Sequence, residues 1–472
     1  MIRVFIVIPL LLAVVTLRAQ HQEIGEDPLI WKTREKNEVD SNAILHAFRN
    51  GRASGHLRYF FMDTQNEGDL TNYFAHAAGG GLKFETARYK GFQMGISGFF
   101  IFNIGSSDFL KTDQRTGQYN RYEIGLFDIG DPTNKRDIDR LEELYLKYNW
   151  KNSSITFGKQ LINTPFINLQ DGRMRPTEVN GLWSNIKFNT ALQAEGGLIY
   201  QISPRGTVDW YRIGESIGIY NSGVDITGRP SNYSGHTETK GILMAGITYR
   251  PRSSLTIHLW EMLTENVFNA AMVQVDAERK LPNDQQLIAG VQLIRIDRVG
   301  DGGNEDPSKQ YMQQKGATTI GARVGWENKK WKTSLNYNRI TREGRYLMPR
   351  EWGRDPFFTF MPRERNEGLA DVHAWVAKAQ RSFPEINGSV GIAVGRYRLP
   401  NVLDASRNKY GLPSYDQLNV DIRYYFKKLL KGMDMQVLYV YKKNGQEANL
   451  DKRFIINRVN MSQWNIVLNY NF

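Results

Sequence analysis

The chain contains no cysteine among its 472 residues. This absence excludes disulfide frameworks, zinc ribbons, thiol redox centres and cysteine nucleophiles. The only long uncharged apolar run lies at the N-terminus, so a bundle of transmembrane helices, each needing ~20 such residues, is also excluded. Aromatic residues make up 12% of the chain and charged residues 23%, which supplies enough apolar surface to drive folding and argues against disorder.

Acidic residues are fewer than basic ones, 49 against 61, which gives a formal net charge of +12. The basic start Met1–Arg3 is followed by the uncharged stretch Val4–Leu17 and by the small residue Ala19. This order is typical of a secretory signal, and we predict that residues 1–19 are cleaved as a signal peptide. A retained membrane anchor is the alternative, although the run is short for a span. An exported basic protein is not expected to bind nucleic acid.

Apolar and polar residues alternate along many segments of about 10 residues. In Gln463–Phe472 one parity holds Trp464, Ile466, Leu468, Tyr470 and Phe472, and the other is mostly amide side chains. The same alternation recurs in Trp331–Asn338 and in Gln417–Phe426. A soluble sheet facing its core would also alternate, but recurrence along the whole chain is typical of a barrel with lipid outside and water inside.

Between Gly55 and Phe472 we count about 18 candidate strands, an even number, and the links between them are alternately short and long. The sequence therefore predicts an all-β fold: a transmembrane antiparallel β-barrel over residues 51–472 in the bacterial outer membrane, with both termini in the periplasm. Residues 20–50 are polar and form a periplasmic lead, too short to be the plug of an energised transporter. In lipid the barrel must close so that no strand edge is unpaired.

Three segments resemble the OprD-type family of outer-membrane porins: Gly55–Phe60, Phe157–Gln160 and above all Asn163–Pro176. The likeness is specific over roughly residues 50–190 and architectural afterwards. Lys159 departs from the arginine usual in the family, which keeps the charge and loses the planar fork. The resemblance implies a substrate-selective channel whose third extracellular loop folds inward, facing a ladder of basic residues on the barrel wall.

A barrel of this size is wide enough for an aqueous channel, so selectivity requires an infolded obstruction. The segment Leu161–Glu178 is the candidate, stiffened at its ends by Pro165 and Pro176, and Gly79–Gly81 would leave space for it against the wall. Its candidate constriction residues are Asn163, Asn168, Gln170, Asp171 and Arg173. The alternative is an external lid or inert brace whose charged residues bond only to the wall.

Six basic residues lie on the polar parity of predicted strands and are candidates for a basic pore wall: Arg58, Lys147, Lys187, Arg323, Lys332 and Arg423. Any one of these residues is equally well explained as a position without a role in transport, but together they predict a lumen that favours anions. Asp171 facing this track would orient zwitterions. We interpret the arginine-rich segment Arg342–Arg365 as a solvated loop held by ion pairs, in preference to an anion-collecting vestibule or a contact with lipopolysaccharide phosphates.

The predicted function is passive, substrate-selective diffusion of small hydrophilic solutes, anionic or zwitterionic, such as amino acids, peptides and carboxylates. We expect no enzyme activity, catalytic residue, cofactor or metal site, since the seven histidines form no motif with Ser or Asp. Expected partners besides solutes are the lipid bilayer, lipopolysaccharide and the barrel-insertion machinery, and the protein is a monomer or a trimer. The alternative is an adhesin, receptor or structural anchor with a closed lumen.

Overall fold

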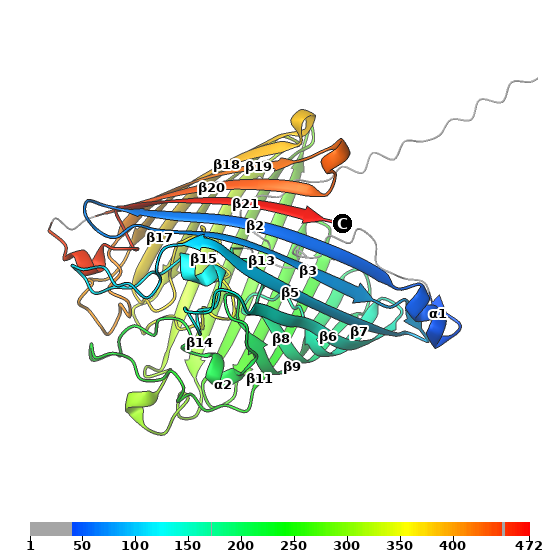
Figure 1. The fold of residues 1–472 in the computed structure, drawn as a ribbon, viewed down its shortest axis with the longest axis horizontal. Helices are drawn as coiled ribbons and strands as arrows, with labels where there is room; N and C mark the ends of the chain where they lie inside the picture. Colours follow the sequence, from blue (N-terminus) through cyan, green and yellow to red (C-terminus); the bar gives the residue numbers. More distant parts are fainter. Residues whose placement is uncertain (1–39, 171, 446–448) are drawn as a thin grey trace, which may run out of the picture.

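The computed structural model describes residues 40–170, 172–445 and 449–472. Figure 1 shows long, tilted antiparallel strands that wrap around one lumen. The barrel strands are β2 (Arg52–Asn66), β3 (Tyr73–Glu85), β5 (Phe92–Ser106), β6 (Ile138–Trp150), β7 (Ser153–Gln160), β8 (Glu178–Lys187), β9 (Leu192–Ser203), β11 (Ile242–Arg252), β12 (Leu255–Thr264), β13 (Phe268–Leu281), β14 (Gln285–Arg298), β15 (Gly316–Glu327), β16 (Trp331–Ile340), β17 (Val372–Phe383), β18 (Gly388–Arg398), β19 (Tyr415–Tyr425), β20 (Met433–Asn444) and β21 (Met461–Asn471).

Short elements lie outside this set. They are the two-residue strands β1 (Asp40–Ser41), β4 (Arg88–Tyr89) and β10 (Tyr211–Arg212), the helices α1 (Ile44–Arg49) and α2 (Ile213–Ser216), and the 3-10 turns η1 (Glu123–Leu126), η2 (Pro307–Lys309), η3 (Pro384–Ile386), η4 (Lys428–Leu430) and η5 (Lys452–Phe454). None of the helices in the described part of the chain is long and apolar enough to cross a membrane.

The barrel closes through its first and last strands. β21 pairs antiparallel with β2, from His56 opposite Asn471 to Asn66 opposite Met461. Within the described residues this gives 18 barrel strands, each paired on both sides, so every edge is satisfied as lipid requires. The predicted 18-stranded antiparallel barrel is confirmed, and the alternating segments Trp331–Asn338, Gln417–Phe426 and Gln463–Phe472 fall on β16, β19 and β21. The predicted signal, residues 1–19, lies outside the described residues, as does 20–39.

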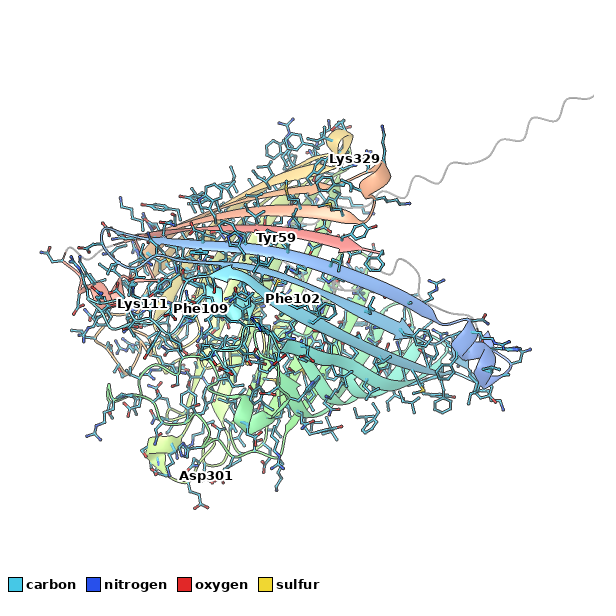
Figure 2. The ribbon with its side chains drawn as sticks, in the orientation of Figure 1. Tyr59, Phe102, Phe109, Lys111, Asp301 and Lys329 are labelled. Carbon is cyan, nitrogen blue, oxygen red and sulfur yellow. The ribbon has the colours of Figure 1, made fainter. Side chains whose placement is uncertain are left out.

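The two faces of the wall follow the sequence alternation. On the outer parity Leu82 and Leu335 each have 64% of their surface exposed, whereas Asn338 and Asn419 on the inner parity are completely buried. Phe102 projects from the outside of the wall in Figure 2. Lipid therefore meets a continuous apolar surface, and the amide side chains line the inside.

The connections have different lengths at the two ends. Lys329 lies in a short turn, and Asp301 lies at the opposite end, where the long loops gather (Figure 2). The long loops used below are loop 2 (107–137), loop 3 (161–177), loop 4 (204–241), loop 7 (341–371), loop 8 (399–414) and loop 9 (445–460). This segregation agrees with short periplasmic turns and long extracellular loops.

Loop 7 folds into the lumen. Trp352 and Phe357 have no exposed surface, and the Trp352 ring stacks on Phe268 of β13 with centroids 6.0 Å apart. Our interpretation of Arg342–Arg365 as a solvated loop was therefore wrong, since Arg345 and Arg365 are buried. The physical reason is the apolar content of the segment, which draws the interleaved arginines inside with it.

The barrel wall holds loop 7 in place through hydrogen bonds to the backbone of the loop. Lumenal side chains donate hydrogen bonds to its carbonyl oxygens, namely Gln292 to Pro356 at 2.9 Å, Lys378 to Phe358 at 2.9 Å, Tyr397 to Thr359 at 2.9 Å and Gln417 to Pro362 at 2.8 Å. A loop without regular structure can be buried only if its backbone polar groups find such partners. The wall thus determines where loop 7 lies in the pore.

Candidate functional site: a basic cavity between the infolded loops

Loop 3 also enters the lumen, with Phe166 and Ile167 fully buried. Its Met174 lies beside Gly79 on β3. A Cβ atom at Gly79 would lie 2.6 Å from the backbone oxygen of Phe100, 2.8 Å from the Phe99 ring and 3.0 Å from the Met174 Cε. Gly79 therefore leaves space for the neighbouring strand as well as for loop 3. A Cβ atom at Gly80 would instead meet Leu57 on the outer face, so the expectation for Gly79–Gly81 holds in part.

Asn168 joins loop 3 to loop 7. Its amide nitrogen donates to the carbonyl oxygen of Arg354 at 2.9 Å, and its amide oxygen accepts from the Arg354 backbone nitrogen at 3.0 Å. The Asn168 backbone nitrogen also donates to the carbonyl of Trp352 at 3.1 Å. Only 6% of the surface of Asn168 is exposed, and its side-chain amide pairs with the backbone of Arg354 as a neighbouring strand would. We expected this amide to face a solute; the structure instead uses it to hold the two loops together.

The C-terminal end of loop 3 is fixed by Arg140 of β6. This fully buried guanidinium donates to the carbonyl of Pro176 at 2.9 Å, to the hydroxyl of Ser203 at 2.9 Å and to the carboxylate of Glu142 at 3.0 Å. One side chain therefore ties the end of loop 3 to the wall, and its further bond to the carbonyl of Pro204 at 3.4 Å holds the start of loop 4. Charge-assisted bonds of this kind restrict loop movement more than neutral ones.

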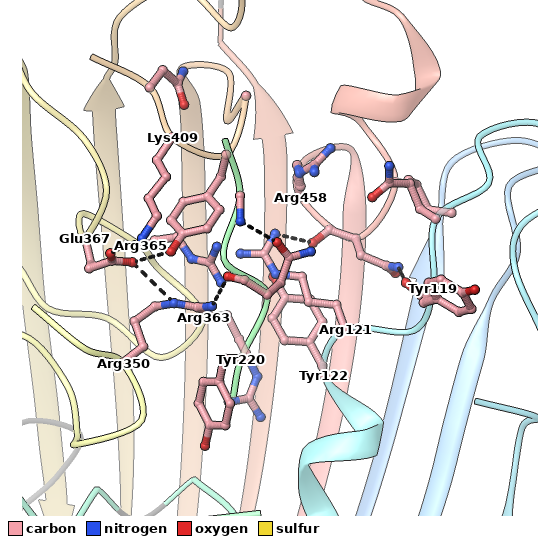
Figure 3. A pocket seen from close by; sticks show the side chains of 18 of the residues that line it. Tyr119, Arg121, Tyr122, Tyr220, Arg350, Arg363, Arg365, Glu367, Lys409 and Arg458 are labelled. Carbon is pink, nitrogen blue, oxygen red and sulfur yellow. Dashed lines mark hydrogen bonds and ion pairs between the residues drawn. The ribbon is translucent and has the colours of Figure 1, made fainter. Parts of the chain in front are cut away.

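A cavity of about 800 Å³ lies between loops 2, 3, 4, 7, 8 and 9 (Figure 3). Basic side chains outnumber acidic ones among its described lining residues. The basic ones are Arg121, Arg173, Arg205, Arg350, Arg354, Arg363, Arg365, Lys409, Arg453 and Arg458, and the acidic ones are Asp355, Glu364 and Glu367. Tyr119, Tyr122, Tyr220, Tyr410, Phe360 and Phe454 add aromatic surface.

Three of these guanidinium groups influence one another strongly. Burial, then repulsion from Arg363 and Arg205, holds the pKa of Arg173 well below its usual value. Burial lowers the pKa of Arg363 to about 10, so the Arg363 guanidinium remains charged at neutral pH. Among the described residues the buried Nε and Nη1 atoms of Arg205 have no hydrogen-bond partner. Arg173, Arg205 and Arg363 therefore repel one another, and the Arg205 guanidinium offers donors to an anion. The Arg363 guanidinium already donates to the side-chain oxygens of Gln463 and Asn465 on the wall.

Glu367, another residue of the cavity lining, is an ion-paired carboxylate (Figure 3). Glu367 contacts the Arg350 guanidinium at 3.3 Å and the Lys409 ammonium at 3.4 Å, and it accepts a hydrogen bond from the Tyr410 hydroxyl at 2.8 Å. The Lys409 ammonium also donates to the Tyr233 hydroxyl at 2.8 Å and lies 5.3 Å from the centre of the Tyr311 ring. Its positive charge is thus compensated within the protein, whereas no carboxylate among the described residues forms an ion pair with Arg173, Arg205 or Arg363.

The other predicted constriction residues have different positions. Gln170 and Arg173 line the cavity. Asn163 is partly buried, and its side-chain oxygen accepts from the backbone nitrogen of Leu169 at 3.5 Å. Asp171 lies outside the described residues.

The six predicted wall cations lie on the lumenal parity of their strands. Arg58 is buried over the Phe60 ring, Arg323 contacts Asp276 at 2.8 Å, and Arg423 contacts Asp421 at 3.0 Å. Lys332 lies 3.9 Å from Glu327. Lys147 shares its face of β6 with buried Tyr145, and Lys187 shares its face of β8 with buried Trp183. None of the six is among the described residues that line the cavity.

Sequence reasoning missed most of the cavity. Arg121, Arg205, Lys409, Arg453 and Arg458 come from loops 2, 4, 8 and 9 and carry no periodic pattern that places them. The one available indication was in loop 7, where Trp352, Phe357, Phe358 and Phe360 accompany the arginines. A strictly solvated loop has no reason to contain so many large apolar side chains.

A closed barrel with a polar lumen, narrowed by infolded loops around a charged cavity, defines a substrate-selective channel of the outer membrane. The sequence model of the OprD family of outer membrane porins matches residues 50–351, more than half of the chain. The protein therefore belongs to the OprD family. It is a non-enzymatic, substrate-specific channel of the bacterial outer membrane.

Solved structures agree with this fold. OccD3 (OpdP) of Pseudomonas aeruginosa superposes with a TM-score of 0.69 at 12% identity, covering 93% of this chain and 95% of that one. OccAB4 of Acinetobacter baumannii gives 0.69 at 15% identity, covering 89% and 98%. OpdK of P. aeruginosa, solved with vanillate, gives 0.68 at 14% identity, covering 90% and 99%. No curated protein sequence shows a significant match to the chain.

Proposed function

We propose that this channel passes small anionic or zwitterionic solutes, such as carboxylates, amino acids and short peptides, passively down their gradients, and that it selects them in the loop cavity. The observation that carries the proposal is the excess of basic over acidic side chains among the described residues lining that cavity. A narrow site with low-dielectric walls concentrates the field of these charges and raises the local concentration of anions.

The arginine cluster is the binding element for the anionic group. Guanidinium groups bind carboxylates in a bidentate geometry, and a bound carboxylate would relieve the mutual repulsion of Arg173, Arg205 and Arg363. Gln170 is the neutral hydrogen-bonding partner beside them. The role expected for Asp171, orienting the ammonium of a zwitterion, stays a prediction.

The aromatic lining extends the solute class to carboxylates with an apolar or aromatic body. Tyr122, Tyr220 and Phe360 line the same cavity as the arginines. The relative solved with vanillate, an aromatic carboxylate, is consistent with such a solute. Beyond the cavity, the lumenal cations Arg58, Lys147 and Lys187 favour anions on the path toward the short-turn end. Arg323, Lys332 and Arg423 contribute less, because each contacts a carboxylate of the wall.

The test is solute flux into vesicles that contain the refolded channel. We expect benzoate to enter faster than benzamide, which has the same shape without the charge. Arg173→Gln combined with Arg363→Gln should abolish this preference, because the solute loses two of the three guanidinium groups. Arg229→Gln is the matched control, since Arg229 is an exposed arginine of loop 4 outside the cavity lining. Equal entry of both solutes through the wild-type channel would refute the proposal.

A further inference from the structure

The short helix α1 has an exposed apolar face. Ile44 has 63% of its surface exposed, and Leu45 and Phe48 are also exposed. Ala47 is buried against the barrel, where its carbonyl oxygen accepts from the backbone nitrogen of Ala87 at 2.9 Å. The exposed polar residue His46 lies about 200° around the helix from Ile44, given ~100° per residue. The helix is therefore amphipathic, with its apolar side directed away from the protein.

This apolar face continues the lipid-facing surface of β3. The Phe48 ring stacks on the Phe84 ring, with centroids 6.4 Å apart and an interplanar angle of 19°. Phe84 has the same strand parity as Leu82, whose side chain is largely exposed on the outside of the wall. The helix thus packs against the membrane side of the barrel and not inside its mouth.

The helix also lies at the height of the membrane boundary. It is at the short-turn end of the barrel (Figure 1), beside the turn that precedes Phe92. The Phe92 ring lies 4.8 Å from the Tyr148 ring, which in turn stacks on Trp150 at 6.0 Å. Aromatic groups at strand ends form the girdles that mark the bilayer interface.

We propose that α1 is an interfacial anchor whose apolar face inserts among the phospholipids of the leaflet at the short-turn end of the barrel. Continuity with the lipid-facing wall selects lipid as the occupant over a protein partner. The exposed side chain of Arg49 follows Phe48 at the end of the helix, where it can meet lipid phosphates. The proposal goes beyond transport and does not depend on which solute passes.

The absence of native cysteine permits a direct test. Single variants Ile44→Cys and His46→Cys, each carrying a nitroxide spin label, are refolded into phospholipid vesicles. Collision with oxygen, which concentrates in lipid, is compared with collision with a water-soluble nickel chelate. Leu82→Cys on the lipid face and Asp301→Cys on the exposed loop are the references for lipid and for water. Heat-modifiable gel mobility verifies that each variant has folded.

We expect the label at position 44 to give an oxygen-to-nickel ratio close to that at 82, and several-fold higher than that at 46. A ratio at 44 equal to the one at 301 would overturn the proposal. Dipolar broadening at 44 that vanishes when labelled protein is diluted with unlabelled protein would also overturn it, because a second copy of the chain would then cover the face.

Discussion

At the residue scale, the net charge of the cavity depends on Asp355, a carboxyl group whose charge changes near neutral pH. Burial, then repulsion from Glu367, raises the pKa of Asp355 to about 7. Attraction to Arg350 lowers the pKa of Asp355 but does not cancel this rise. Asp355 is one of three acidic residues in the described lining, so its ionisation changes the balance that favours anions.

The sign of the pH dependence follows directly. A carboxyl is neutral below its pKa, so the cavity is more positive at about pH 5.5 than at about pH 8.5. Anion selectivity, measured as the reversal potential in a salt gradient, should therefore fall as pH rises through about 7. Asp355→Asn should remove most of this fall in anion selectivity, so that the variant keeps at high pH the selectivity that the wild-type channel shows at low pH. Asp301→Asn, an exposed substitution outside the cavity, should leave the change intact.

At the scale of elements, the pore is narrowed by two loops that depend on each other. Loop 3 brings Gln170 and Arg173 to the cavity, whereas loop 7 brings Arg350, Arg363 and Phe360. The wall holds loop 7 by its carbonyl groups, and Arg140 holds the end of loop 3. Asn168 is the joint between them.

Asn168→Ala should loosen this joint. It removes the two hydrogen bonds between the Asn168 side chain and the backbone of Arg354, at a cost of about 2 kcal/mol in the stability of the loop contact. Single-channel recordings should show larger current noise and a higher mean conductance, because the loops then fluctuate out of the pore. Asn103→Ala, which removes one partly buried bond to Ser106, is the control and should leave the noise unchanged. Identical noise in both variants would show that Asn168 does not hold the loops.

At the scale of the whole molecule, the wall could be predicted from the sequence and the cavity could not. Because lipid lies outside the wall and amide side chains lie inside, apolar and polar residues alternate along each strand, as in Trp331–Asn338. The position of a strand and the side to which each residue points therefore follow from the local sequence pattern. Arg121, Arg205 and Lys409 lie on separate loops, and only the folded barrel brings them together. Loop 3 was recognisable by its resemblance to the family, whereas loop 7 was not, because its burial depends on partners such as Gln292 and Gln417 from distant strands.

The same substitution should destabilise the barrel much more on the lipid face of the wall than on the lumenal face. Leu335→Arg places a charge on the lipid side near the middle of β16 and should cost about 2–4 kcal/mol of folding free energy. Ser334→Arg, one residue away on the lumenal side, should cost much less because its side chain meets water. Urea unfolding of both variants in phospholipid vesicles measures the difference. Equal destabilisation would contradict the assignment of faces.

The central claim is that the loop cavity makes the channel prefer anions. The most direct measurement is the reversal potential of single channels in a planar bilayer under a tenfold salt gradient, first for the wild-type protein and then for Arg173→Gln with Arg363→Gln. We predict an anion-selective wild-type channel and a clear shift toward cation selectivity in the double variant. A cation-selective wild-type channel, or an unchanged reversal potential in the double variant, would contradict the account.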